Sequence, residues 1–272
     1  MLKLIATDMD GTLLNDKKEM PENTFEVIDK LHERGITFAV ASGRGHLSLQ
    51  KIYDKIKDDI VIIAGNGGVI IDKGKIIFAN TMKPDVVREL VEAVSKMPDL
   101  KINLSGLNSA YMFEDNIIDV MPKYLVESHF PIRKIINNLD EIPADEEILQ
   151  VSIFDPNYNS KANIYEKLKH FEGRCHLAIS ESQWVDIMNI GVNKGVAIQK
   201  LQEILEAEPE ETMVFGDELN DYEMMQQAYY SYAMENAVSQ IKEVSNFTAP
   251  SNEEQGVTRI LENFLAMTKM YV

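Results

Sequence analysis

Short apolar runs alternate with amphipathic segments at both ends of this chain, and this alternation limits the folds that it can adopt. The runs at residues 2–7, 36–41 and 60–64 predict buried strands, and the segments between them have helical spacing. The same alternation returns from residue 194 to residue 267. Strands that are joined by helices over short connections form parallel sheets. We therefore predict an α/β fold whose core is a doubly wound, Rossmann-like parallel sheet.

The middle of the chain has a different pattern. Residues 102–113, 148–154 and 175–188 have the features of strands and hairpins, and helices are predicted at residues 84–97, 118–128 and 161–171. Such a mixture is typical of an antiparallel sheet with helices on one face. We therefore predict a core domain built from residues 1–82 and 188–272, into which residues 83–187 are inserted as an α+β domain.

Charge and composition exclude several classes of protein. The chain has 272 residues, with 44 Asp and Glu against 27 Lys and Arg, and a net charge of -17. Nucleic-acid binders and proteins that bind anionic membranes carry basic surfaces, so neither partner is expected. The single cysteine, Cys175, cannot form a disulfide within the chain, and no apolar run has membrane-spanning length. We expect a cytoplasmic protein, and nothing in the sequence specifies its oligomeric state.

The first chemical motif, Asp8-Met9-Asp10-Gly11-Thr12, follows the first predicted strand. Side chains at positions i and i+2 of extended backbone point the same way, so Asp8 and Asp10 can reach one site. Two carboxylates that share a site repel each other unless a cation lies between them or one is protonated. Hard oxygen ligands favour Mg²⁺. The alternative is a polar strand end with a helix cap.

Three further motifs lie at later strand–helix boundaries: Ser42-Gly43-Arg44, Lys194, and Gly216-Asp217 with Asn220-Asp221. A hydroxyl and free N–H groups at a helix start suit a phosphate. Taken singly, the motifs are also compatible with an ordinary turn, a surface lysine and an acidic loop with a helix cap, the last chiefly for Asp221. Together they supply a hydroxyl turn, a lysine and an Asp/Asn cluster to one edge of one sheet.

These four motifs resemble those of the haloacid dehalogenase superfamily, and the insertion between the second and third resembles its Cof-type phosphatase branch, which carries a large α+β cap. The resemblance spans essentially the whole chain. It implies that Asp8 is the nucleophile and also a ligand of Mg²⁺, and that Asp10 is the general acid and base and binds the metal through its main-chain carbonyl. Asp217 would bind the metal directly, and Asp221 directly or through water.

The same resemblance assigns the phosphate to Met9, Ser42, Gly43, Lys194 and Asn220. It implies Mg²⁺-dependent hydrolysis of small phosphomonoesters, such as sugar phosphates or phosphorylated cofactors, through a phospho-Asp8 intermediate. The partner is then a small phosphorylated metabolite. A sugar phosphomutase and a phospho-acceptor signalling module are the alternatives, and the base at Asp10 and the large insertion argue against the second. The run at residues 65–68 either lines the substrate pocket or forms a plain turn.

Overall fold

The computed structural model describes residues 1–97, 99–113, 126–127 and 129–268. The predicted helix at residues 118–128 therefore lies almost wholly outside the described residues. The chain divides into two compact units. The core unit comprises Met1–Ser42, Tyr53–Ile77 and Asn193–Val272, and the cap unit comprises Gly43–Ile52 and Phe78–Val192. Residues 43–52 group with the cap unit, whereas our domain division at residues 82/83 and 187/188, which stays a prediction, assigns them to the core.

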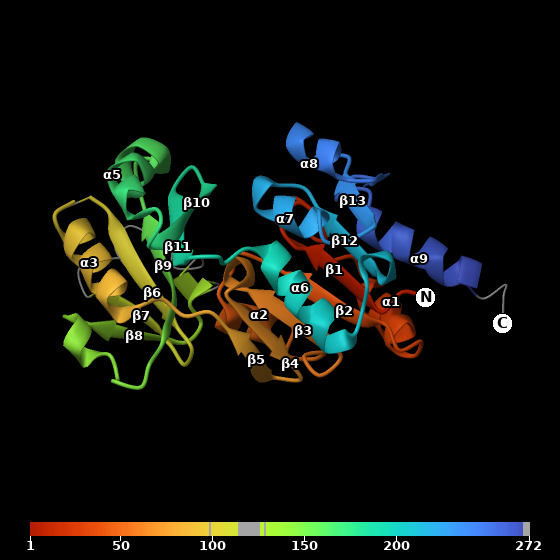
Figure 1. Cartoon of the computed structure of the whole chain (residues 1–272), viewed down its shortest axis with the longest axis horizontal. Coiled ribbons are helices and arrows are strands. Elements are labelled where there is room, and N and C mark those ends of the chain that lie inside the picture. Colours follow the sequence, from red (N-terminus) through yellow and green to blue (C-terminus); the bar gives the residue numbers. More distant parts are fainter. Residues whose placement is uncertain (98, 114–125, 128, 269–272) are drawn as a thin grey trace. The chain divides into compact units, whose positions relative to one another are not determined.

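An eight-stranded sheet runs through the core unit in the order β14-β13-β12-β1-β2-β3-β4-β5. All its described pairings are parallel except that between β3 and β4, so the predicted doubly wound parallel sheet is confirmed (Figure 1). The strands are β1 (Leu4–Asp8), β2 (Thr37–Ala41), β3 (Ile60–Ala64), β4 (Val69–Asp72), β5 (Lys75–Ala79), β12 (Thr212–Gly216), β13 (Tyr230–Met234) and β14 (Phe247–Ala249).

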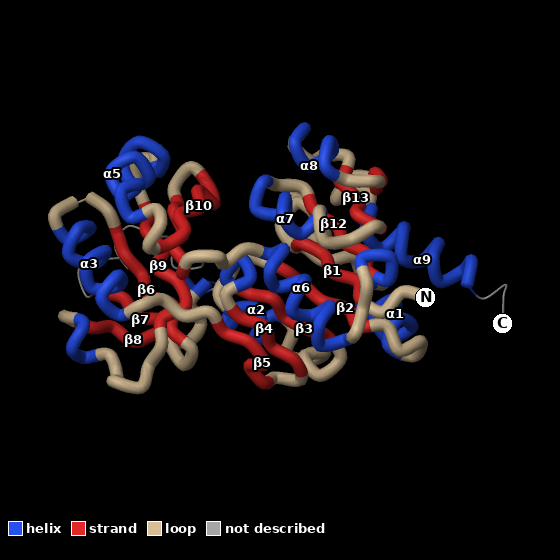
Figure 2. The backbone as a smooth tube through the Cα atoms, viewed as in Figure 1, coloured by secondary structure: helices blue, strands red, loops and turns tan. Residues whose placement is uncertain are grey.

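Helices complete the core unit because its central strands are apolar on both faces. Every residue of β1 is buried, so neither face of that strand meets solvent. Helix α1 packs against α9, and α6 packs against α7, so two pairs of helices cover the sheet (Figure 2). The helices of this unit are α1 (Thr24–His32), α6 (Lys194–Leu205), α7 (Tyr222–Met225), α8 (Ser239–Val244) and α9 (Gly256–Thr268), with short 3-10 turns at Gly65–Gly67, Pro209–Glu211 and Leu219–Asp221.

The cap unit holds a six-stranded sheet in the order β10-β11-β9-β6-β7-β8. Its apolar core lies between one face of this sheet and the helical segments α3 and 161–171. The strands are β6 (Lys101–Gly106), β7 (Ala110–Phe113), β8 (Arg133–Ile136), β9 (Ile148–Phe154), β10 (Cys175–Glu181) and β11 (Trp184–Asn189). The helical segments are α2 (His46–Ile52), α3 (Pro84–Ser95), a 3-10 turn at Leu139–Glu141, a π-helical turn at Lys161–Tyr165, α5 (Glu166–Leu168) and a 3-10 turn at Lys169–Phe171.

Two details of the cap unit differ from the sequence prediction. Strand β8 was not predicted, and it pairs parallel with β7, so the sheet is mixed rather than antiparallel. The strand has only four residues, and a half-exposed edge strand of this length shows little alternation in its sequence. The helix predicted at residues 161–171 is present, but it is divided into π, α and 3-10 turns.

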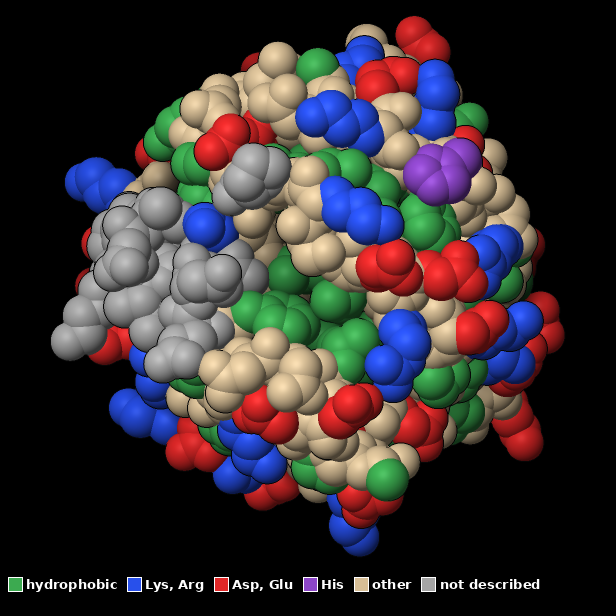
Figure 3. Space-filling view, turned by 90° about the vertical axis from the view of Figure 1, so that its left-hand side faces the viewer, with side chains coloured by type: hydrophobic (Ala, Val, Ile, Leu, Met, Phe, Trp, Pro, Cys, Tyr) green, Lys and Arg blue, Asp and Glu red, His purple; other side chains and the backbone are tan. Residues whose placement is uncertain are grey.

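Charged side chains of both signs lie on the surface of the cap-side view of the molecule. On the face drawn in Figure 3, Lys and Arg side chains are interspersed with Asp and Glu side chains around exposed apolar groups. Among the described residues, no helix is both long enough and apolar enough to cross a membrane.

Candidate active site

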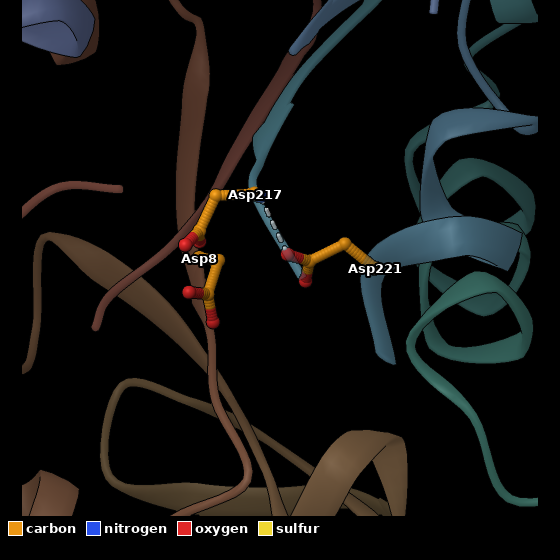
Figure 4. A group of neighbouring side chains, drawn as sticks. All are labelled: Asp8, Asp217 and Asp221. Carbon is orange, nitrogen blue, oxygen red and sulfur yellow. Dashed lines mark hydrogen bonds between the residues drawn. The ribbon is translucent and has the colours of Figure 1, made fainter. Parts of the chain in front are cut away.

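Strands β1 and β12 bring the two strongest predicted residues together. These strands are parallel neighbours in register, with Thr7 opposite Phe215, so their carboxyl ends lie at the same edge of the sheet. Asp8 ends β1 and Asp217 follows β12, and each is only 6% exposed. Figure 4 shows their carboxylates side by side, with Asp221 directed toward them from the segment before α7.

Lys194 is the cation of this cluster. It is completely buried at the start of α6, and its Nζ lies 2.5 Å from Asp8 Oδ1 and 2.5 Å from Asp221 Oδ1. The preceding residue, Asn193, caps the helix by accepting a hydrogen bond from the Val196 N–H. A fully buried lysine is rare unless it is paired. The lysine that could have been an ordinary surface charge therefore lies between two carboxylates.

Asp221 has two roles in the geometry of the cluster. While Oδ1 contacts Lys194, Oδ2 accepts hydrogen bonds from the main-chain N–H groups of Asp217 and Glu218, at 2.9 and 3.2 Å. Gly216 lies so close that a Cβ there would come within 2.7 Å of Asp221 Cβ. The carboxylate therefore holds the loop after β12 in the conformation that presents Asp217.

Gly11 and Thr12 of the first motif both contact Asp217. Gly11 has a φ of +88°, and a Cβ at this position would collide with the Asp217 carboxylate. Thr12 Oγ1 donates a hydrogen bond to Asp217 Oδ1 at 2.6 Å. Asn236 Nδ2 donates to the Gly11 carbonyl at 2.8 Å, which anchors the turn from the other side. The Gly-Thr part of the motif is thus explained by contacts with a residue more than 200 positions away.

Burial dominates the electrostatics of the cluster. It raises the pKa of Asp8 well above its usual range; Lys194 opposes this shift, and the nearby Asp221 and Asp217 add to it. Burial, opposed by the Thr12 hydrogen bond and reinforced by Asp221, raises the pKa of Asp217 to about 6. Burial by itself lowers the pKa of Lys194, but the charges of Asp221 and Asp8 outweigh it, and the pKa rises overall. Unless further positive charge is added, the cluster therefore disfavours the simultaneous ionisation of all its carboxyl groups.

The donor set fits a divalent cation. Carboxylate oxygens of Asp8, Asp217 and Asp221 all lie within 4.8 Å of one another, and all three residues are buried. One ammonium, that of Lys194, faces these three carboxylates, so two negative charges within the cluster remain to be balanced. Buried charges are stable only when they are paired or coordinate a metal. An all-oxygen set of this kind is typical of Mg²⁺ and Ca²⁺ sites.

The Asp10 carboxylate lies outside this group of three. Its side chain is 31% exposed, and Oδ1 forms an ion pair with Lys18 Nζ at 2.9 Å. Lys18 has a left-handed backbone, with a φ of 63°, in the turn after the motif. Sequence reasoning did not find this lysine, because a lone lysine in a polar turn carries no signal of its own. The role that the resemblance assigned to the Asp10 main-chain carbonyl stays a prediction.

The predicted phosphate-binding residues are linked by an asparagine that the sequence left undecided. Asn66 has a left-handed backbone in the Gly65–Gly67 turn and is only 5% exposed. Its N–H donates to the Ser42 carbonyl at 3.0 Å, and its Oδ1 accepts a hydrogen bond from Asn220 Nδ2 at 3.0 Å. The Met9 side chain is completely buried. Gly43, which follows Ser42 directly, is the first residue of the cap unit.

The arrangement of aspartates, lysine and serine turn at one sheet edge can be compared with known proteins. The sequence model of the haloacid dehalogenase-like hydrolase family matches residues 5–261. The chain belongs to this family. This chain is 30% identical over 266 residues to the 5-amino-6-(5-phospho-D-ribitylamino)uracil phosphatase YbjI of Escherichia coli. The match covers 97% of this chain and 96% of that protein.

Other similar proteins agree with this assignment. The HMP-PP phosphatase of Cronobacter sakazakii is 30% identical over 243 residues, which cover 89% of this chain and 87% of that one. Among solved structures, SMU.1108c from Streptococcus mutans superposes with a TM-score of 0.86 at 29% identity, covering 98% of this chain and 100% of that one. The present protein is thus a haloacid dehalogenase-like hydrolase whose named relatives include phosphatases.

Proposed function

We propose that this hydrolase removes phosphate from small phosphomonoesters, such as sugar phosphates or phosphorylated cofactors, with Mg²⁺ and through a phospho-Asp8 intermediate. The observation that carries the proposal is the buried contact of Asp8 with Lys194 beside two further aspartates. A carboxylate nucleophile divides one difficult hydrolysis into two easier steps. Phosphoryl transfer needs positioning and charge neutralisation more than covalent assistance.

Asp8 is the attacking group. A nucleophilic carboxylate must be ionised, whereas burial favours its protonated form. Lys194 opposes that effect from 2.5 Å and also offsets the charge of an approaching phosphoryl group. Mg²⁺, held by Asp8, Asp217, Asp221 and the Asp10 main-chain carbonyl, would supply the remaining positive charge and orient the phosphoryl oxygens. Ser42, the Gly43 N–H and Asn220 would hold the other oxygens of the phosphate.

Asp10 is the proton carrier in both steps. In the first step it protonates the leaving oxygen as the bond to phosphorus breaks, and in the second it removes a proton from the water that attacks phospho-Asp8. Asp10 forms an ion pair with Lys18 at 2.9 Å. The ion pair would also hold the Asp10 carboxylate in place between the two steps.

The relatives support the class of substrate. Their names describe phosphatases of a phosphorylated ribitylaminouracil and of HMP-PP. We therefore expect the purified protein, supplied with Mg²⁺, to release inorganic phosphate over many turnovers from p-nitrophenyl phosphate. It should do the same for at least one member of a panel that contains sugar phosphates, phosphorylated cofactors and 5-amino-6-(5-phospho-D-ribitylamino)uracil.

Two outcomes of the same experiment would contradict the proposal. Labelling of Asp8 in a single round, without further phosphate release, would indicate a phospho-acceptor module. Isomerisation of a sugar phosphate without phosphate release would indicate a phosphomutase.

A further inference from the structure

The chain that follows Asp10 forms a turn, residues 11–18, which returns to the same aspartate. A short β-bridge joins Leu14 to Asp10, and the Leu14 N–H donates to the Met9 carbonyl at 2.8 Å. At the end of the turn, Lys18 forms its ion pair with the Asp10 carboxylate. We call residues 11–18 the motif turn. Because the Asp10 side chain is bonded to this turn, its position depends on how the turn is held.

Two loops that are distant in the sequence contact the motif turn. Asn236 follows β13 and Asn252 follows β14, and both strands run in the same direction as β1. The loops after these strands therefore leave the sheet at the same edge as the motif turn does. Asn252 is only 4% exposed, whereas Asn236 is exposed. All these segments belong to the core unit.

The two asparagines make hydrogen bonds that only one orientation of each amide allows. Asn236 Nδ2 donates to the Gly11 carbonyl at 2.8 Å, and its Oδ1 accepts from the Asn252 main-chain N–H at 3.1 Å. Asn252 Nδ2 donates to the Leu14 carbonyl and to Asp16 Oδ1, both at 3.1 Å. A carbonyl oxygen only accepts and a main-chain N–H only donates, so turning either amide over would break bonds to the main chain.

Glu253 adds another contact with the same turn. Its Oε1 accepts a hydrogen bond from the Asp16 main-chain N–H at 2.7 Å. Beyond Leu14 the motif turn is mostly exposed, so little apolar burial holds Asp16 and Lys18 in place. The hydrogen bonds from the loop after β14 therefore fix the part of the turn that carries Lys18.

We propose that Asn252 and Glu253 are positioning residues that act on Asp10 through the motif turn, and that Asn236 joins them to Gly11. A general acid must lie within hydrogen-bond reach of the leaving oxygen. Misplacement of a catalytic group by about 1 Å can slow a reaction about 10²-fold. The inference rests on the proposed phosphatase function and deepens it at the proton transfer by Asp10.

The test compares phenyl phosphate with p-nitrophenyl phosphate, which share a ring but differ in how much the leaving oxygen needs a proton. Asn252→Ala should lower kcat/KM for phenyl phosphate about 10-fold and kcat/KM for p-nitrophenyl phosphate less than about threefold. Glu253→Ala removes one hydrogen bond and should lower the ratio of the two values about 2–3-fold. Glu253→Gln keeps an oxygen that can accept from the Asp16 N–H, so it should retain the wild-type ratio.

Asn246→Ala is the matched control. Asn246 lies in the core unit, and its Nδ2 donates to the Tyr229 carbonyl at 2.8 Å, so the substitution removes a similar bond from a different loop. It should leave the ratio unchanged, whatever its effect on Tm. A lower Tm with an unchanged ratio in Asn252→Ala would overturn the inference, because the contact would then serve only the fold. If Asn252→Ala does not fold, Glu253→Ala decides, since that side chain is exposed.

A double-mutant cycle shows whether the effect passes through Asp10. Asp10→Asn alone should lower the ratio, and adding Glu253→Ala to it should lower the ratio no further. An equal drop in both backgrounds would overturn the proposed route. The proposed function fails in a different way: absence of phosphate release from p-nitrophenyl phosphate by the wild type would overturn it, and the inference with it. Release of phosphate with a wild-type ratio in Asn252→Ala and Glu253→Ala would overturn the inference alone.

Discussion

The aspartate cluster of the core unit and a row of largely buried polar side chains on the cap sheet (Asn103, Ser105, Gln150, Ser152 and Asp186) satisfy their polar groups differently. In the cluster, Lys194 contacts two carboxylates, and Asp217 accepts from Thr12. In the row, two uncharged amide oxygens have no donor among the described residues. A buried charge without a partner is far more costly than an unpaired amide oxygen. The difference teaches that this protein pairs its buried charges with one another, whereas it leaves neutral amide oxygens without a donor.

The largest effect should come from the cluster. Asp8→Asn keeps the shape of the side chain but removes its nucleophilicity, so turnover of every substrate should fall by about 10³-fold or more. Phosphate release and circular dichroism measure activity and folding on the same sample. Asp29→Asn, at an exposed position of α1, is the control and should behave like the wild type. Activity near the wild-type level in folded Asp8→Asn protein would exclude Asp8 as the nucleophile.

Removal of the metal should also lower the turnover of every substrate. Excess EDTA should abolish turnover and Mg²⁺ should restore it, whereas Ca²⁺ should inhibit because its larger and looser coordination misplaces the attacking oxygen. Mg²⁺ should also raise Tm, since a ligand that binds only the folded state stabilises it. Asp217→Asn should reduce that rise, and Gln150→Met should leave it intact. Undiminished turnover in EDTA would count against a metal in the mechanism.

Asp10→Asn should separate substrates by the leaving group that each one carries. General acid catalysis is worth about 10²–10⁴-fold, and p-nitrophenolate scarcely needs a proton when it leaves. The first step should therefore slow more for alkyl phosphates than for p-nitrophenyl phosphate. With the aryl substrate, phospho-Asp8 should accumulate because the second step has lost its base.

Rapid-quench labelling measures both steps of the Asp10→Asn enzyme. If the first step slows equally for both kinds of substrate and no phosphoenzyme accumulates, Asp10 serves the metal site alone.

The smallest expected effect is a change in the pH dependence of Tm, and it concerns His46. Its Nε2 donates to the Leu107 carbonyl at 2.9 Å, which anchors the segment after Ser42 to the end of β6. Burial lowers the pKa of His46, although the Leu107 carbonyl and the charge of Glu146 act in the opposite direction. The unfolded chain therefore takes up a proton at a higher pH than the folded protein does. This contribution to stability is complete above about pH 6.5 and is lost as the pH falls below it. Tm should drop by a few degrees more between pH 7.5 and 5.5 in the wild type than in His46→Gln.

His170→Gln is the control for that measurement, because His170 is exposed on the cap unit. It should keep the wild-type dependence of Tm on pH. Identical pH slopes in the wild type and His46→Gln would show that this anchor is not sensitive to protonation.

The sequence by itself determined the parts of this protein that are encoded locally. Apolar runs with the length of strands predicted β1, β2 and β3, and the motifs at the strand ends identified Asp8, Lys194 and Asp217. The structure brings these three residues together because parallel strands place their carboxyl ends at one edge whatever lies between them in the chain. The family followed from the same residues, and the match over residues 5–261 confirms it.

Only the tertiary structure decided which polar groups meet across long separations. The ion pair of Lys18 with Asp10 and the bond between Asn66 and Asn220 depend on how loops turn, and a loop of polar residues has no periodicity to read. The bond from Ser152 to Asp186 depends on the register of β9 against β11, and a shift of one strand by one residue would place the two side chains on opposite faces of the sheet. Hydrophobic pattern predicts that a strand exists, but its partner and register arise from packing of the whole sheet.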